Sequence, residues 1–120
     1  MARTAITVQE ITRGTPLTDL TWTAASAAND HYFINSGREI LLTKNGDASP
    51  HTITVVSVTD GFARTGDHSL VTGASDNCAD GFFLPEVWNQ RGASELGQVH
   101  IDIGSGEDTS MYLAVIRPAS

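Results

Sequence analysis

Short runs in which apolar and polar residues alternate, separated by glycine, asparagine, aspartate and proline, dominate this 120-residue chain. The first run, TAITVQEI, places Ile6 and Val8 on one side of an extended strand and mostly polar residues on the other. Alternation with a period of two, bounded by turn residues, is typical of a β-strand with one buried face. The pattern therefore predicts a first strand within residues 4–11.

The clearest strand signal is the stretch REILLTKNGDASPHTITVVSV, residues 38–58. We expect EILLTK and TITVVSV to form a β-hairpin around the loop Asn45–His51, with Asn45-Gly46 supplying positive φ angles. The first of these strands would be apolar on both faces, with Ile40 and Leu42 on one side and Leu41 on the other. Such a strand lies between two packed layers or beneath a subunit contact.

The rest of the chain continues this strand pattern. FFLPEVWNQ, GQVHIDIG and TSMYLAVIRP read as further strands, whereas residues 24–28 could form one helical turn and no 3.6-residue period is sustained. We expect one all-β domain over residues 1–120, an antiparallel β-sandwich or jelly-roll-like fold of about eight strands. The predicted core contains Ile6, Val8, Phe33, Leu42, Val55, Phe83, Val99, Ile101, Leu113 and Val115.

Charge and composition exclude several classes of partner. Seven Lys and Arg residues against fourteen Asp and Glu residues give a net charge of −7, which repels nucleic acid and anionic membranes. No apolar run approaches the roughly 18 residues that span a bilayer, and the amino terminus lacks the apolar centre of a signal peptide, so we expect synthesis in the cytoplasm. Cys78 is the only cysteine, so no intrachain disulfide can form.

No motif for catalysis, cofactor binding or a metal site emerges, and we expect no enzyme. His31, His51, His68 and His100 form no His-x-His pair and are predicted to be surface or loop residues. DNCADG, residues 76–81, lacks the ligand spacing of a calcium loop, and its aspartates are expected to cap turns. Nucleophile elbows and glycine-rich phosphate loops are absent from the sequence.

The aromatic residues leave one alternative open. Trp22, Trp88, Tyr32 and Tyr112 could form a platform on which sugars stack, which would make the chain a glycan-binding or host-adhesion module. Aromatic residues of a small β-domain more often anchor its core or an interface. We therefore rank adhesion second.

Three stretches of the chain resemble a family of small virion proteins encoded among the head genes of tailed bacteriophages. They are MARTAITVQEITRG, ANDHYFINSGREILLTKNG and GFFLPEVWNQRGASELGQVHIDI. The shared pattern is an Arg-Thr amino terminus, an Asn-x-His-x-Phe approach to a Gly-Arg strand, and a Phe-x-Pro segment that ends in an aromatic residue and Asn. The region between Gly61 and Asp80 is longer than in that family.

The resemblance implies a capsid decoration or cement protein, a structural virion component that clamps neighbouring capsomers on the outside of the head. Its partners would be the major capsid protein and further copies of itself, in a trimer or another homo-oligomer, and it would reside on the virion. No nucleic acid, membrane or cofactor is implied.

We expect the capsid or subunit interface to involve the amino-terminal segment, residues 2–13, and the loop Asn45–His51. An edge strand could add to a neighbouring sheet while arginines bind carboxylates of the shell. The alternative, equally weighted, is that this segment completes the domain's own sheet. The interface residues proposed from the sequence are Arg3, Ile6, Val8, Arg13, Asn45, Gly46, Asp47, His51 and Trp88.

Overall fold

The structure, a computed structural model, describes residues 3–14, 16–18, 20–58, 66–81, 83, 85–91 and 95–118. Within these ranges the chain forms ten strands and one helical turn, so the predicted all-β class is confirmed. Two of these strands are only two residues long, which brings the number above the predicted eight. FFLPEVWNQ, expected to be a strand, instead contains the helical turn at residues 85–88. In chain order the elements are β1 (Thr4–Ala5), β2 (Val8–Ile11), β3 (Thr23–Ala24), β4 (His31–Ile34), β5 (Ile40–Asn45), β6 (His51–Val56), β7 (His68–Thr72), β8 (Asn77–Asp80), α1 (Pro85–Trp88), β9 (Gln98–Ile103) and β10 (Met111–Pro118).

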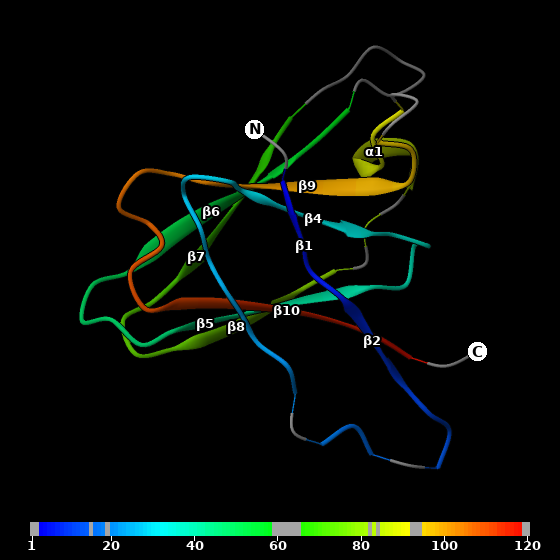
Figure 1. Cartoon of the computed structure of the whole chain (residues 1–120), viewed down its shortest axis with the longest axis horizontal. Coiled ribbons are helices and arrows are strands. Elements are labelled where there is room, and N and C mark those ends of the chain that lie inside the picture. The colour runs from blue at the N-terminus through cyan, green and yellow to red at the C-terminus, as the bar shows by residue number, and fades with distance from the viewer. Residues whose placement is uncertain are drawn as a thin grey trace.

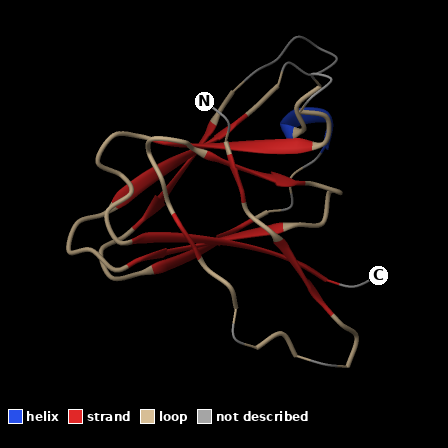
Figure 2. Ribbon diagram, in the orientation of Figure 1, coloured by secondary structure: helices blue, strands red, loops and turns tan. Residues whose placement is uncertain are grey.

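The strands build a sandwich of two sheets that lie one above the other in Figure 1. Sheet A has the order β1-β4-β9-β6-β7, and sheet B has the order β2-β10-β5-β8, with β3 also paired to β10. The last two strands, β9 and β10, occupy central positions, one in each sheet. Figure 2 shows how strands make up nearly all of both layers, with α1 beside the end of β9. The predicted sandwich is thus present.

The sheets are not purely antiparallel, as the sequence pattern had suggested. The amino-terminal run divides into β1, which pairs in parallel with β4, and β2, which pairs in parallel with β10. A single extended segment thus adds a strand first to the edge of sheet A and then to sheet B (Figure 1). Between the two strands Ile6 turns into the core, where it is only 3% exposed. The segment completes the chain's own sheets.

The predicted hairpin is wrong, although both of its strands exist. β5 lies in sheet B, paired with β10 and β8, whereas β6 lies in sheet A, paired with β7 and β9. Their inner faces meet across the core, so the loop between them arches from one sheet to the other. Among the described residues neither Asn45 nor Gly46 has a positive φ. The strong pattern of each strand required a buried face, and stacking the two strands meets that requirement as well as pairing them does.

Alternating residues from both sheets fill the core. Of the predicted core, Ile6, Phe33, Val55, Phe83, Val99, Ile101, Leu113 and Val115 are buried, and Val8 is partly buried against them. Two buried threonine hydroxyls, Thr43 on β5 and Thr72 on β7, satisfy each other across the sheets at 2.7 Å. Leu41, Ile53, Ile103 and Met111 complete the interior.

Leu42 was wrongly predicted to lie in the core. β5 alternates between half-buried and buried positions, and Leu41, fully buried, is the side chain that points inward. Leu42 pairs with Ala114 on the outer face of sheet B. Because both faces of this strand are apolar, its sequence pattern does not determine the register, and a shift of one residue exchanges the two faces.

Two weaker expectations were partly met. In place of a helical turn at 24–28, the Asp30 amide donates to the Ser26 carbonyl at 2.9 Å, closing one turn just afterwards. Asp76 and Asp80 accept bonds from the amides that follow them, as expected of turn caps. The turn-rich region 61–80 contributes β7 and β8, and residues 61–65 lie outside the described ranges.

The register of β5 leads to a first prediction. Leu41→Ala should lower the free energy of unfolding by about 2–5 kcal/mol because it leaves a cavity in the core. Leu42→Ala, on the outer face, should cost about 1 kcal/mol or less. Urea denaturation of both variants measures the difference. A larger loss of unfolding free energy for Leu42→Ala would contradict this register of β5.

Candidate interaction surfaces

The described part of the amino-terminal segment is bonded to its own domain before β2, with the Thr4 amide donating to the Asp30 carbonyl and the Ile6 amide to the Tyr32 carbonyl. The Arg3 guanidinium donates to the Ile101 carbonyl at 3.1 Å and pairs with the Asp102 carboxylate at 2.8 Å, both on β9. Ile6 is buried, and Val8 packs against the core. The charge and apolar side chains proposed for a shell contact are therefore largely used within the chain. A role for the segment in binding a shell stays a prediction.

Two other residues proposed for the interface, Arg13 and Trp88, lie in different surroundings. Arg13 is exposed just after β2. Trp88 ends α1 and packs edge-on against Phe83 at 6.0 Å between ring centroids and against His68 at 6.3 Å. It is a partly buried anchor beside the core.

The loop between β5 and β6 is organised by the buried side chain of Asn45. Its amide nitrogen lies within hydrogen-bond distance of the Ser49, Thr72 and Gly73 carbonyls, and its oxygen accepts the Asp47 amide at 2.9 Å. The exposed Gly46 donates its amide to the Ser110 carbonyl at 2.9 Å. Asn45 is thus a scaffold for the loop, and the surface that the loop presents consists mainly of residues 46–50.

His51 lies between two carboxylates at this end of the sandwich. Its Nε2 is 2.8 Å from an oxygen of Asp47, and its Nδ1 is 3.1 Å from an oxygen of Glu107 in the loop between β9 and β10. The same Glu107 oxygen accepts the Thr52 amide at 2.6 Å. Both ring nitrogens can donate only in the imidazolium form. The bond to Asp47 raises the pKa of His51 against the effect of burial, with Glu107 adding to it, and the pKa of Asp47 is lowered in turn by His51.

The rings of His31 and His100 are buried. His31 accepts the Ser26 amide at Nε2, 2.9 Å away, and its Nδ1 lies 3.2 Å from the Thr4 carbonyl, which suits the tautomer protonated at Nδ1. Burial lowers the pKa of His31, and burial together with Arg3 lowers that of His100. Three of the four histidines are therefore buried strand residues, and the expectation of surface or loop histidines was wrong for them.

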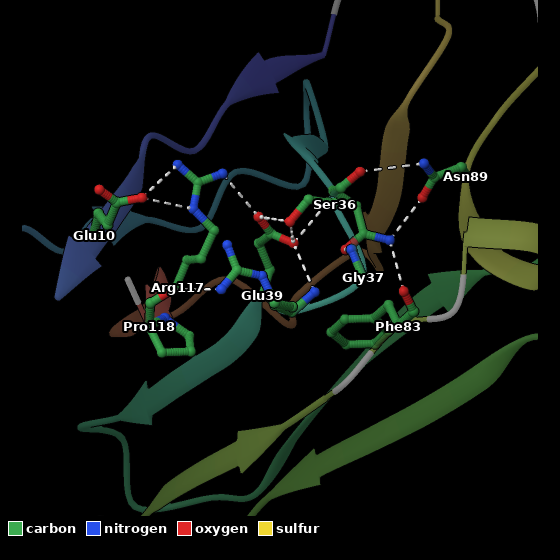
Figure 3. A network of polar contacts seen from close by, with 10 residues as sticks. Glu10, Ser36, Gly37, Glu39, Phe83, Asn89, Arg117 and Pro118 are labelled. Carbon is green, nitrogen blue, oxygen red and sulfur yellow. Dashed lines mark hydrogen bonds and ion pairs between the residues drawn. The ribbon is translucent and has the colours of Figure 1, made fainter. Parts of the chain in front are cut away.

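A polar clasp joins the two ends of the chain at the opposite end of the sandwich (Figure 3). Glu39, whose side chain is 0% exposed, accepts the Ser36 amide at 2.7 Å and the Ser36 hydroxyl at 3.0 Å. Arg117 on β10 donates to Glu39 at 3.2 Å and also to Glu10 on β2. Burial alone would raise the pKa of Glu39, but the bonds from Ser36 and Arg38 outweigh it and lower the pKa. The carboxylate stays charged and holds β2, β5 and β10 together.

A second set of bonds extends this clasp toward α1. The Asn35 amide donates to the Phe83 carbonyl and to the Asn89 side chain, both at 2.7 Å. Gly81, at φ 147°, passes so close to the Glu39 backbone that a Cβ would lie 2.7 Å from the Glu39 carbonyl oxygen. Only glycine fits this position without a shift of the backbone.

The outer face of sheet B is apolar, and no further sheet or helix of the described chain packs on it (Figures 1 and 2). The segment before β3 covers part of it, because Thr21 bonds to Gln9, Trp22 contacts Lys44 and Ala114 is 0% exposed. At the outward positions of its strands no acidic residue occurs, and the one charge is that of Lys44, the only lysine of the chain. A hollow of about 280 Å³, lined by Ile40, Ala79, Asp80 and Gly81, adjoins the face. The outward residues are Gln9, Ile11, Ile40, Leu42, Lys44, Asn77, Ala79, Tyr112, Ala114 and Ile116.

At one end of this face two aromatic rings flank Lys44. Its ammonium nitrogen lies 4.6 Å from the Trp22 ring centroid and 5.2 Å from that of Tyr112, within the range of cation–π attraction. Tyr32 lies on the other sheet and Trp88 on α1, so the four aromatic residues form no single platform. The Lys44 ammonium group lies over the faces of the Trp22 and Tyr112 rings, on which a sugar would have to stack.

The interface residues proposed from the sequence do not converge on one patch. Figure 1 shows the loop between β5 and β6 at one end of the sandwich and α1 at the other. Sequence reasoning missed the aromatic pair around Lys44 and the Glu39–Arg117 pair. The solitary lysine was a usable signal for the first, whereas the second joins residues 78 positions apart and leaves no local signal.

No group of three or more His, Cys, Asp or Glu side chains suited to a metal ion occurs among the described residues. No helix in the described part of the chain has the length and apolarity to cross a membrane.

Comparison of the chain with protein-family models, with curated proteins and with solved structures found no match. The resemblance to head proteins of tailed phages stays a prediction.

The histidines lead to a prediction about pH. His51 should titrate above the ordinary value of about 6.5, and His31 and His100 below it. The raised pKa of His51 adds stability that is fully present below about pH 6.5 and is lost as the pH rises through the pKa of the folded state. The lowered pKa values of His31 and His100 have the opposite effect, because folding stability falls as the pH drops below about 6.5. Stability should therefore peak near pH 6.5. NMR titration of the ring protons tests this. A His51 pKa at or below 6.5 would show that the two carboxylates do not stabilise its imidazolium form.

The polar clasp leads to a second prediction for this part of the molecule. Glu39→Gln should lower the free energy of unfolding by about 1.5–3 kcal/mol because several donors lose a charged acceptor. Glu10→Gln provides the matched control: its side chain is 50% exposed, and loss of its bond to Arg117 should cost about 1 kcal/mol or less. Denaturant unfolding of both variants gives the comparison, and equal losses would show that Glu39 adds nothing beyond a surface pair.

Proposed function

We propose that this protein is a capsid decoration protein of the kind found on the heads of tailed bacteriophages. It binds the major capsid protein from outside and stabilises contacts between capsomers. It acts on the virion as a homo-oligomer, a trimer in the first place, after synthesis in the host cytoplasm. It has no enzymatic role in this proposal.

The residues that carry the family resemblance support this reading because they contact one another. Arg3 of the Arg-Thr amino terminus bonds to the carbonyl of Ile101 on β9. Asn35, in the approach to the Gly-Arg strand, bonds to Asn89, which ends the Phe-x-Pro segment. The shared pattern therefore describes how a sandwich is held together, as expected of a structural protein.

The outer face of sheet B is the observation that carries the proposal. A net charge of −7 keeps the polar surface strongly solvated, and yet Leu42, Ile116 and Tyr112 leave apolar side chains partly exposed on this sheet face. Apolar side chains that gather on one face, rimmed by polar residues, mark protein interaction sites. The adhesion alternative would instead need accessible aromatic faces, which Lys44 approaches here.

Reconstitution of heads tests the proposal. Purified chain added to phage heads assembled without it should remain bound after washing, at a saturating mass ratio, and should appear as extra density outside the shell in electron micrographs. Decorated heads should also resist osmotic disruption better than bare heads. No retained chain after washing, or density confined to the tail, would refute the function.

A further inference from the structure

We propose that the outer face of sheet B, centred on Lys44, is the docking surface of this protein, and that it receives a carboxylate flanked by apolar side chains on the shell protein. This inference rests on the proposed function and specifies the partner's chemistry at the contact.

Charge complementarity identifies the occupant. No ion pair joins Lys44 to a carboxylate among the described residues, and no outward position of β2, β10, β5 or β8 is acidic. A lysine pressed into an apolar contact would lose its hydration and must gain an anionic partner. Asp80 lines the adjoining hollow, but its carboxylate already lies 2.6 Å from His68 Nε2, so a carboxylate for Lys44 must come from outside.

The surroundings of Lys44 suit the centre of a protein interface. Trp22 and Tyr112 hold its ammonium group between them, which restricts the flexible side chain before any partner arrives. Tyrosine and tryptophan are the residues that dominate the energy of such contacts. Leu42 and Ile116, along the same face, provide the apolar area around the charge, and the hollow beside Ile40 can accept an apolar side chain.

A second copy of this chain fits the face poorly in a two-fold arrangement. Lys44 lies near one end of β5, opposite Tyr112 of β10. Ile40 lies at the other end, opposite Ile116. A two-fold axis near Lys44 would bring two lysines together, and one near Leu42 would bury each lysine against Ile40 or Ile116. Like charges in contact and an unpaired buried charge both oppose binding.

Binding to chain-free heads, measured as the mass ratio after washing over a range of chain concentrations, tests the inference. Lys44→Met keeps the length and apolar stem but removes the charge, and should weaken binding on the order of tenfold to a hundredfold. Lys44→Glu and Leu42→Asp should weaken it further. Added salt should weaken the wild type but affect Lys44→Met much less.

Val71→Asp is the matched control, since it adds an acid at an outward strand position, 55% exposed, on the opposite sheet. It should bind as the wild type does. Circular dichroism and thermal unfolding verify that every variant keeps the fold, and Lys44→Met provides the reading if Leu42→Asp does not fold.

The outcomes separate the two proposals. Failure of the wild type to bind heads would overturn the proposed function and this inference with it. Wild-type binding that all sheet B variants retain would overturn the docking face alone. Two other results would also overturn the docking face, because each would show that it binds a different partner. One is self-association in light scattering that Leu42→Asp abolishes. The other is binding of an acidic oligosaccharide that Lys44→Met abolishes.

Discussion

Strand β5 carries large side chains on both faces, and the described part of the chain covers only the inner one completely. Leu41 and Thr43 point into the sandwich, where sheet A closes over them, whereas Leu42 and Lys44 point outward beside β10. Covering the inner face determines the sandwich itself, because β5 and β6 must stack across the core and the last two strands must enter the middle of each sheet. The exposed part of the outer face is what remains available for a partner.

Polar groups fix the ends of the two layers. At one end Glu39 binds Arg117 and the Ser36 turn, and at the other His51 joins the carboxylates of two loops. Each of these buried charges is satisfied by several partners, as a low-dielectric interior requires.

The sequence predicted the class of fold and most of the core because both depend on local alternation. It misjudged features that depend on contacts between distant segments. Nothing within residues 38–58 distinguishes a hairpin from an arch between sheets, and nothing in ILLT tells which leucine points inward. His31 and His51 were likewise misjudged, because the groups that satisfy their rings come from other loops and strands. For the candidate surface, the period of β5 predicted an apolar outer side, but the aromatic pair around Lys44 brings together residues 22 and 112.

A reconstruction of decorated heads by cryo-electron microscopy, at a resolution that shows side chains, tests the central claim most directly. We expect sheet B to face the shell, with the Lys44 ammonium about 2.7–2.9 Å from a shell carboxylate and Leu42 covered. A reconstruction in which the outer face of sheet B is turned to solvent, while another surface of the sandwich contacts the shell, would contradict it.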